Sequence, residues 1–378
     1  MNFKTFPLES LAKIKYGKNQ KNVEDINGRI PIFGTGGLIG HANEYLHDKP
    51  SVLIGRKGSI SKVKYIEVPF WTVDTLFYTE INEEIVIPKY LYYLMSLFDL
   101  SQFDEGTTIP SLTTRTLNSL EFNIPSLEYQ KKAIKILSNF DKKINIATKI
   151  NKNLENQLQM IFKSWFFEFT PFKNEKFIES KLGLIPTGWK VVNLGNVVTK
   201  TKDRVNTKDL KVLSAVKTGH LKLSEEYFTK QVFSKNIEKY IVVDKKGFAY
   251  NPARINIGSI GRNDFDFVGC VSPVYIVFKS EKNYNNFFDM YFKTSRFKQE
   301  VIVRSSGSVR QNLNFKDFSL IQLVYPPIEV IDRFNAVYDS LFKMQNNNTI
   351  KNEKLSKIRD ILLPKLMSGE IDISEVKI

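Results

Sequence analysis

The feature that most constrains the fold of this chain is an internal repeat, in which similar segments recur about 200 positions apart. The stretch EGTTIPSLTTRTLNSLEFNIP ends at Pro125, and its counterpart SGSVRQNLNFKDFSLIQLVYP ends at Pro326, with matching apolar positions. A shorter match, Gly-Ser-Ile, begins at Gly58 and again at Gly258. The chain therefore uses one structural unit twice.

A long helix is predicted after the proline of each copy, because apolar residues recur there at alternating steps of three and four, as in a coiled coil. The first seam contains Gln130, Ala133, Leu137, Phe140, Ile144, Ala147, Asn151, Leu154, Leu158, Ile161 and Trp165. The second seam contains Ile331, Phe334, Tyr338, Leu341, Gln345, Asn348, Asn352, Leu355, Arg359, Leu362 and Leu366.

Both seams are polar in the middle, at Asn151, Gln345, Asn348 and Asn352. If the helices run antiparallel, these residues face each other and fix the register of the coil. The alternative is two unrelated amphipathic helices, each lying on its own core.

The remaining segments are rich in short β-type runs such as SVLIG and VYIVF, separated by Gly, Asn and Pro. Single helices are expected at PKYLYYLMSLF (88–98) and NNFFDMYFKTSRFKQEV (285–301). The predicted fold is α+β, with two similar β-rich domains joined by two long helices that form an antiparallel coiled coil with pseudo-two-fold symmetry. The expected boundaries are 1–125, 126–170 for the first helix, 171–326, and 327–378 for the second helix and tail.

The composition favours a polyanionic partner, because 55 Lys and Arg face 40 Asp and Glu, giving a net charge of +15. A Lys- and Asn-rich proteome is the alternative explanation. The single cysteine, Cys270, excludes an internal disulfide and makes the cytoplasm the default compartment. The three histidines lack the spacing of zinc ligands, and the most apolar run, YLYYLMSLF, is too short to span a membrane. We therefore expect no metal and no membrane association.

The order of several motifs resembles one known family, the specificity (S) subunits of type I restriction-modification systems. The motifs are FGTGGLIG (33–40), YNPARINIGSIG (250–261), SWFFEFTPF (164–172), LGLIPTGWKVVNLG (182–195) and LLPKLMSGEIDIS (362–374). Together they cover essentially the whole chain.

The resemblance implies a non-catalytic subunit whose two target-recognition domains each read one half of a split sequence in double-stranded DNA. It also implies that the helices set the half-site separation and dock two methyltransferase (modification) subunits, which restriction/translocase subunits then join. Under this reading the chain binds no cofactor, and S-adenosylmethionine, ATP and Mg belong to the partner subunits. The alternatives are the specificity subunit of a type II methylase-nuclease fusion system, an orphan or decoy specificity protein, and a purely structural coiled-coil protein.

The stretch YNPARINIGSIGR (250–262) superficially resembles the Asn-Pro-Pro-aromatic loop of DNA methyltransferases. Ala253 and Arg254 stand where that motif needs proline and an aromatic residue, so we interpret the stretch as a strand and turn of a recognition domain. Arg, Asn and Gln can read base edges, and Lys, Ser and Thr can bind phosphate oxygens. The candidate DNA contacts are Arg56, Lys57, Ser59, Lys62, Thr107, Thr108 and Arg115 in the first copy, and Arg254, Asn256, Arg262, Asn263, Ser308, Arg310, Gln311 and Asn312 in the second.

The predicted spacer generates a test. A helix of roughly 36 residues is on the order of 50 Å long, and one turn of DNA is about 34–36 Å, so two domains on such helices could read neighbouring major-groove segments. Lengthening the first helix by one heptad is expected to change the spacer length recognised and to leave both half-site sequences intact. Methylome sequencing of a host that carries the variant measures both, and changed half-sites with the old spacer would refute the ruler hypothesis.

Overall fold

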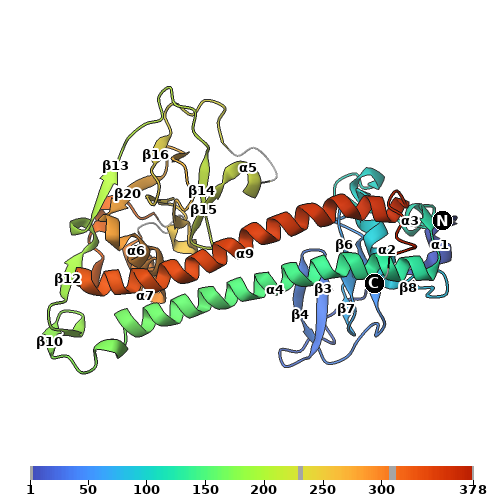
Figure 1. Ribbon diagram of the computed structural model, residues 1–378, viewed down its shortest axis with the longest axis horizontal. Coiled ribbons are helices and arrows are strands. Elements are labelled where there is room, and N and C mark those ends of the chain that lie inside the picture. Colours follow the sequence, from blue (N-terminus) through green and yellow to red (C-terminus); the bar gives the residue numbers. More distant parts are fainter. Residues whose placement is uncertain (1–2, 229–232, 306–311, 377–378) are drawn as a thin grey trace. The chain divides into compact units, whose positions relative to one another are not determined.

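The protein is described by a computed structural model that covers residues 3–228, 233–305 and 312–376 (Figure 1). It divides into two compact units. Unit 1 consists of Met1–Lys149 together with Asn348–Ile378, and unit 2 consists of Ile150–Asn347. Each unit thus contains one β-rich domain and a portion of each of the two long helices.

Unit 1 is built on an antiparallel four-stranded sheet of order β2-β8-β5-β6, beside a three-stranded sheet of order β4-β3-β7 and the pair β1-β9. Its strands are β1 (Lys4–Pro7), β2 (Ala12–Tyr16), β3 (Ile30–Gly34), β4 (Gly37–Ala42), β5 (Ser51–Gly55), β6 (Val63–Ile66), β7 (Trp71–Thr72), β8 (Leu76–Ile81) and β9 (Glu121–Ile124). Its short helices are α1 (Leu8–Leu11), α2 (Pro88–Ser96), η1 (Leu100–Phe103) and α3 (Thr114–Asn118).

Unit 2 is built on a six-stranded sheet of order β13-β20-β17-β18-β15-β14, with the pairs β12-β21, β16-β19 and β10-β11. Its strands are β10 (Phe177–Ser180), β11 (Gly183–Pro186), β12 (Lys190–Asn193), β13 (Val198–Thr201), β14 (Leu213–Val216), β15 (His220–Leu223), β16 (Ile241–Val243), β17 (Phe248–Tyr250), β18 (Ile260–Arg262), β19 (Gly269–Val271), β20 (Ile276–Ser280) and β21 (Gln322–Tyr325). Its short helices are η2 (Thr170–Phe172), η3 (Leu194–Asn196), α5 (Ser224–Tyr227), η4 (Ile255–Ile257), η5 (Lys282–Tyr284), α6 (Asn285–Tyr291), α7 (Ser295–Arg304) and α8 (Phe315–Ser319).

The two domains repeat the same strand pairings. The antiparallel series β2-β8-β5-β6 of unit 1 corresponds to β13-β20-β17-β18 of unit 2, and the pair β1-β9 corresponds to β12-β21. A backbone hydrogen bond between the first and last segments of each domain also recurs. The Leu8 amide donates to the Leu120 carbonyl, and the Leu194 amide donates to the Ile321 carbonyl, both at 2.8 Å. The predicted α+β fold with two similar domains and long helices is therefore confirmed.

The long helices are α4 (Leu127–Phe166) and α9 (Ile328–Ser368), and their segments pair side by side within each unit (Figure 1). In unit 2 the pairing is closed by two reciprocal bonds: Asn151 Nδ2 donates to the Gln345 carbonyl at 3.1 Å, and Gln345 Nε2 donates to the Asn151 carbonyl at 3.0 Å. In unit 1, Asn352 Nδ2 donates to the Ile144 carbonyl at 3.3 Å. Because Asn151 follows Ile144 while Gln345 precedes Asn352, the contacts follow an antiparallel register.

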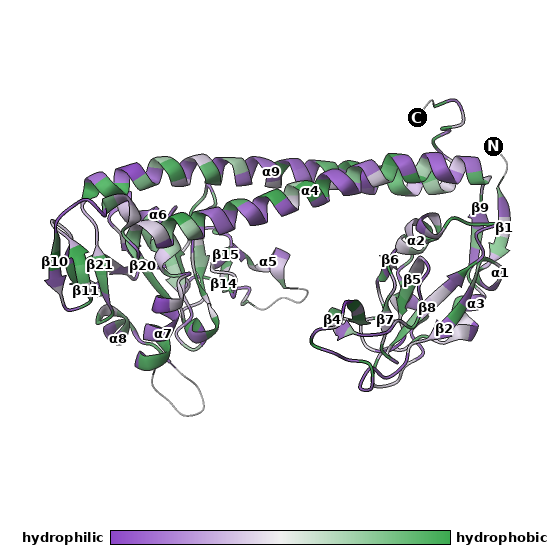
Figure 2. Cartoon of the chain, turned by 90° about the horizontal axis from the view of Figure 1, so that it is seen from below, coloured by the Kyte–Doolittle hydropathy of each residue, from purple (hydrophilic) through white to green (hydrophobic). Residues whose placement is uncertain are grey.

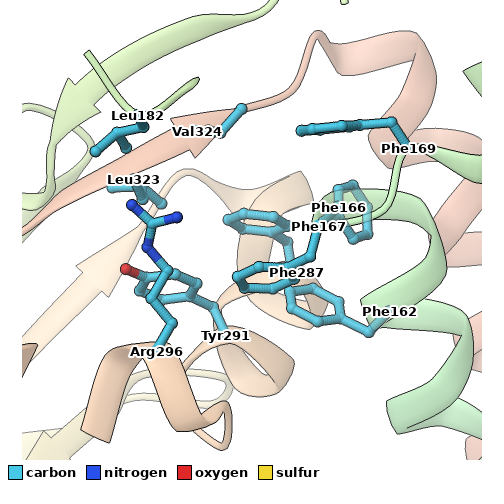
Figure 3. Close-up of a pocket in the computed structure, with 10 residues that line it drawn as sticks. All are labelled: Phe162, Phe166, Phe167, Phe169, Leu182, Phe287, Tyr291, Arg296, Leu323 and Val324. Carbon is cyan, nitrogen blue, oxygen red and sulfur yellow. The ribbon is translucent and has the colours of Figure 1, made fainter. Parts of the chain in front are cut away.

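The hydropathy of the helices changes along their length, with apolar clusters toward their ends and polar residues in the middle (Figure 2). In unit 2 the aromatic run at the end of α4 packs inward, with Phe166 only 4% exposed and its ring 5.1 Å from that of Phe334. Phe162 and Phe166 line a cavity of about 70 Å³ together with Phe287 and Tyr291 (Figure 3). These aromatic residues therefore pack in the interior of unit 2 and do not offer a surface on which bases could stack.

The segment predicted as a single helix over 285–301 is instead two helices, α6 and α7. The break lies at Thr294, whose extended backbone and side chain cap α7 by accepting a hydrogen bond from the Phe297 amide at 3.2 Å. The apolar spacing alone did not reveal the break, because Phe292 and Phe297 are buried on either side of it.

Arg262 and Asn263, predicted to contact DNA, have a different role in the structure because both side chains are buried. The Arg262 guanidinium donates from Nε to Asp264 and from its terminal nitrogens to Asn286 and to the Tyr338 hydroxyl, at 2.7, 2.7 and 2.9 Å. Asn263 Nδ2 donates to three backbone carbonyls, those of Val243, Asp244 and Phe267. The Arg262 bonds connect β18 to α6 and α9.

The same network contains a buried carboxylate, Asp289, which accepts from the Tyr338 hydroxyl at 2.8 Å and pairs with Lys293 at 3.1 Å. Burial on its own would raise the pKa of Asp289, but Lys293 and Arg262 outweigh that effect and hold the pKa well below its usual range. His220 lies close to these groups, and burial, reinforced by Lys293, lowers the pKa of its imidazole.

None of the helices in the described part of the chain combines the length and the hydrophobicity that a membrane span requires.

Removing the Arg262 guanidinium tests its structural role. Arg262→Ala removes the buried guanidinium that bonds Asp264, Asn286 and Tyr338 and faces Asp289, so that Asp289 keeps only Lys293 and Asp264 only Lys246, and we expect the free energy of unfolding of unit 2 to fall by about 3–5 kcal/mol. Urea unfolding followed by tryptophan fluorescence is suitable, because Trp165 and Trp189 lie in unit 2. The control is Lys245→Ala, which removes an ion pair to the exposed Asp266 and should change little. Equal effects of the two substitutions would contradict the assignment.

The lowered pKa of His220 predicts a pH dependence of stability. As the pH falls below about 6.5, the unfolded chain protonates this imidazole before the folded chain does, so stability decreases. The contribution of Asp289 to stability is lost only at more acidic pH, because the pKa of its carboxyl is lowered in the folded protein. Between pH 7.5 and 5.0 the melting temperature should therefore fall less in His220→Gln than in the unaltered protein. An unchanged slope would show that His220 does not titrate in this way.

Candidate nucleic-acid interface

Two loops that the sequence singled out in the first copy lie against each other in unit 1. One follows β5 and contains Arg56–Lys62, and the other runs into the first residues of α3 and contains Thr107–Arg115. The Gly58 amide donates to the Pro110 carbonyl at 2.8 Å, and the Leu112 amide donates to the Arg56 carbonyl at 2.9 Å. The structure thus brings together candidates separated by about 50 positions in the sequence.

The side chains of these loops are largely exposed. Lys57, Ser59, Lys62, Thr107, Thr108 and Arg115 are all exposed, and Arg56 is half-buried. The surface also carries the exposed carboxylate of Glu105, which accepts from the hydroxyls of Thr113 and Thr116 and keeps its negative charge. The surface formed by the two loops presents four cations, of which Arg56 is half-buried, and several hydroxyls that can bind phosphate or base edges.

Local interactions hold the second loop of unit 1 in shape. The Asp104 carboxylate accepts from the amides of Gly106 and Ser111, both at 2.8 Å. A Cβ on Gly106 would lie 2.0 Å from the Ile109 carbonyl oxygen, so only glycine fits this close approach. Asp104 is not among the residues predicted from the sequence, although an aspartate two residues before glycine is a typical turn signal.

Unit 2 brings its two candidate loops together in the same way. The Leu313 amide donates to the Pro252 carbonyl at 3.1 Å, as the matching Leu112 does to Arg56 in unit 1. Arg254 is exposed, Asn256 is half-buried, and Asn312 is exposed beside the Leu313 bond. Ser308, Arg310 and Gln311 lie outside the described residues.

The backbone of the repeated Gly-Ser-Ile supports the correspondence. Gly58 and Gly258 both have left-handed backbones, with φ of 85° and 88°, where a side chain would be strained. In unit 2 the turn before Gly258 contains the short helix η4, for which unit 1 has no equivalent among its elements. The candidate loops of the two units therefore share this glycine turn and differ in the residues that they expose.

The stretch YNPARINIGSIGR has no features of a catalytic site in this structure. It forms the end of β17, a turn through η4, and β18, as the sequence predicted. The segment FGTGG (33–37) ends β3 at Gly34 and begins β4 at Gly37, which is a strand-turn-strand and not the strand-turn-helix of a cofactor-binding loop. Burial raises the pKa of the Cys270 thiol to about 12, so this cysteine is not an activated nucleophile.

Comparisons with known proteins agree with the earlier resemblance. A family model described as "Type I restriction modification DNA specificity domain" matches residues 1–156. The chain is 29% identical over 350 residues to the type I restriction enzyme MjaIX specificity subunit of Methanocaldococcus jannaschii, covering 87% of this chain and 79% of that protein. It is 25% identical to the HindI specificity subunit of Haemophilus influenzae, covering 77% and 79%.

A solved structure has the same fold. The S subunit of a type I restriction-modification system from M. genitalium matches with a TM-score of 0.60 and 16% identity, over 97% of this chain and 96% of that chain.

Proposed function

We propose that the chain is a specificity subunit of a type I restriction-modification system and that its two β-rich domains each read one half of a split sequence in double-stranded DNA. In this assignment residues 1–125 form the first target-recognition domain and 171–326 contain the second, while 126–170 and 327–378 form the helical spacer. As a specificity subunit the chain is the non-catalytic component that gives its system its DNA specificity.

The observation that best supports two reading sites is the matched pair of loop junctions. Leu112 and Leu313 occupy the same place in the repeat, and each fixes the loop carrying the candidate contacts to the end of a central strand. The same backbone scaffold then presents Arg56, Lys57 and Lys62 in one domain but Arg254 and Asn256 in the other. Different side chains on one scaffold are suited to reading two different half-sites.

The helices suit the role of a fixed spacer. At about 1.5 Å per residue, a 40-residue helix such as α4 is about 60 Å long, and an antiparallel pair is stiffer than a single helix. The reciprocal bonds between Asn151 and Gln345 oppose a slip in register, because a shift would leave their amides unpaired. We propose that Asn348 and Asn352 also help to fix the register of the coil, because they lie in the middle of the second helix.

We further infer that two modification subunits, and the restriction subunits that join them, supply the chemistry together with S-adenosylmethionine, ATP and Mg, and that the complex acts in the cytoplasm. The excess of 15 positive charges favours association with DNA through release of counterions, so binding should weaken with salt. Methylome sequencing of the host with and without this gene would reveal the split target.

Matched substitutions test whether each domain reads its own half-site. Arg115→Ala in the first domain and Arg254→Ala in the second each remove one exposed cation. With the complex of the full chain and its modification subunits, each is expected to weaken binding through its own half-site only. If the lost cation contacts a base, discrimination at that base pair should fall by about 1–3 kcal/mol. If it contacts a phosphate, the slope of the logarithm of the binding constant against the logarithm of the salt concentration should decrease by about 1.

Binding is measured on DNA with both half-sites intact and with either half scrambled. If Arg115→Ala altered discrimination at the same half-site as Arg254→Ala, the assignment of one half-site to each domain would be wrong. A complex that binds all sequences equally would instead point to a decoy specificity protein.

A further inference from the structure

Arg56 lies at the junction of the two candidate loops in unit 1, with its backbone fixed on both sides. Its amide donates to the Thr75 carbonyl and its carbonyl accepts from the Leu112 amide, both at 2.9 Å. The preceding Gly55 cannot be replaced without a shift, because a Cβ there would lie 2.3 Å from the Ser59 carbonyl oxygen. The fold therefore fixes the backbone position from which the Arg56 side chain extends.

The guanidinium of Arg56 is also held in place, but it is not neutralised. Its Cζ lies 5.5 Å from the centre of the Tyr16 ring, a cation–π contact at the end of β2. Tyr16 is 53% exposed, and its ring lies edge-on to the ring of the buried Phe77, with 5.0 Å between the ring centres. Among the described residues no hydrogen-bond or ion-pair partner of this guanidinium is found, and its Nε is buried without an acceptor.

Three other arginines behave differently, and Arg333, which also lies over aromatic rings at Trp165 and Phe172, belongs to α9 and not to a candidate loop. Arg262, Arg304 and Arg359 each pair with a carboxylate of Asp264, Glu300 or Asp141 at 2.7–3.0 Å, as expected of arginines that stabilise the fold. Arg56 is ordered by a ring instead of by an acid, so its donors keep their capacity to bind an external acceptor. A guanidinium held in this way loses little rotational freedom when it binds.

The fold itself does not require an arginine at this position. The matched bonds made by Leu112 and Leu313 identify Pro252 as the counterpart of Arg56 in unit 2. A proline has no side-chain donor, yet the strand and the loop junction of unit 2 are formed in the same manner. The Arg56–Tyr16 pair is thus specific to the first domain.

We propose that Arg56 donates two hydrogen bonds to O6 and N7 of a guanine in the first half-site, and that Tyr16 is the positioning residue that holds its guanidinium. This assignment rests on the proposed function and specifies the base read by this domain. The planar fork of an arginine matches the two acceptors that guanine presents in the major groove. The exposed ammonium groups of Lys57 and Lys62 nearby are better suited to phosphates, since they are flexible point charges.

The test uses the complex of the full chain with its modification subunits and the DNA target defined by methylome sequencing. In the unaltered complex, one guanine of the first half-site should be sensitive to replacement by 7-deazaguanine, which lacks the N7 acceptor. Arg56→Ala should remove that sensitivity and lower discrimination at this base pair by about 5- to 150-fold. Discrimination at the second half-site should be unchanged, and Arg56→Lys, which keeps the charge but not the fork, should behave like Arg56→Ala.

The positioning role of Tyr16 has its own readout. Tyr16→Leu should reduce discrimination at the same guanine to a smaller extent, and Tyr16→Phe, which retains the ring, should restore it. An equal loss of affinity for all sequences in Arg56→Ala would indicate a phosphate contact and overturn the assignment, as would unchanged discrimination at every guanine. If the unaltered complex showed no sequence preference at all, the proposed function itself would fail.

Discussion

Neither β-rich domain completes its hydrophobic core without the long helices. In unit 1, Ala133 and Leu137 of α4 and Leu366 of α9 belong to the same buried cluster as the strand residues Val52 and Ile54. In unit 2 the cluster around β17 and β20 includes Phe162 and Phe166 of α4 and Phe334 of α9. Burial of these side chains contributes on the order of 1.5–3 kcal/mol each, so the helices are part of each folding unit and not an independent linker.

This dependence explains how polar groups are distributed. In the middle of the long helices, amides such as Asn151 and Gln345 bond from one helix to the other. Next to the domains, charged groups bond to or across the long helices: Asp289 of unit 2 accepts from the Tyr338 hydroxyl of α9, and in unit 1 the half-buried Asp141 of α4 pairs with Arg359 of α9 and accepts from the Tyr93 hydroxyl. A displaced helix would leave these groups without partners in a poorly solvated environment, which penalises alternative registers.

The same scaffold can carry different binding surfaces, because the conserved bonds of the repeat lie in the backbone. Leu112 and Leu313 use only their amides to fix the loops, and the side chains beyond them differ freely between the two domains. The first domain exposes Lys57 and Lys62 near Arg56, whereas the second has Pro252 and Arg254 in the corresponding loop. The proposed function, in which the two domains read different half-sites, requires such a separation between the residues that build the fold and those that would contact DNA.

The sequence by itself determined the duplication, the α+β class and the two long helices, because these are expressed in periodic patterns and in repeated spacing. It also identified loops that the structure brings together in each unit, since turn residues and cations cluster locally along the chain. Tertiary structure alone decided which side chains are free to act. Arg262 and Arg56 look alike in sequence, each next to a Gly-rich turn, but one is buried among Asp264, Asn286 and Tyr338 while the other stacks on Tyr16. Burial and pairing depend on residues far apart in the chain, and a local pattern carries no information about them.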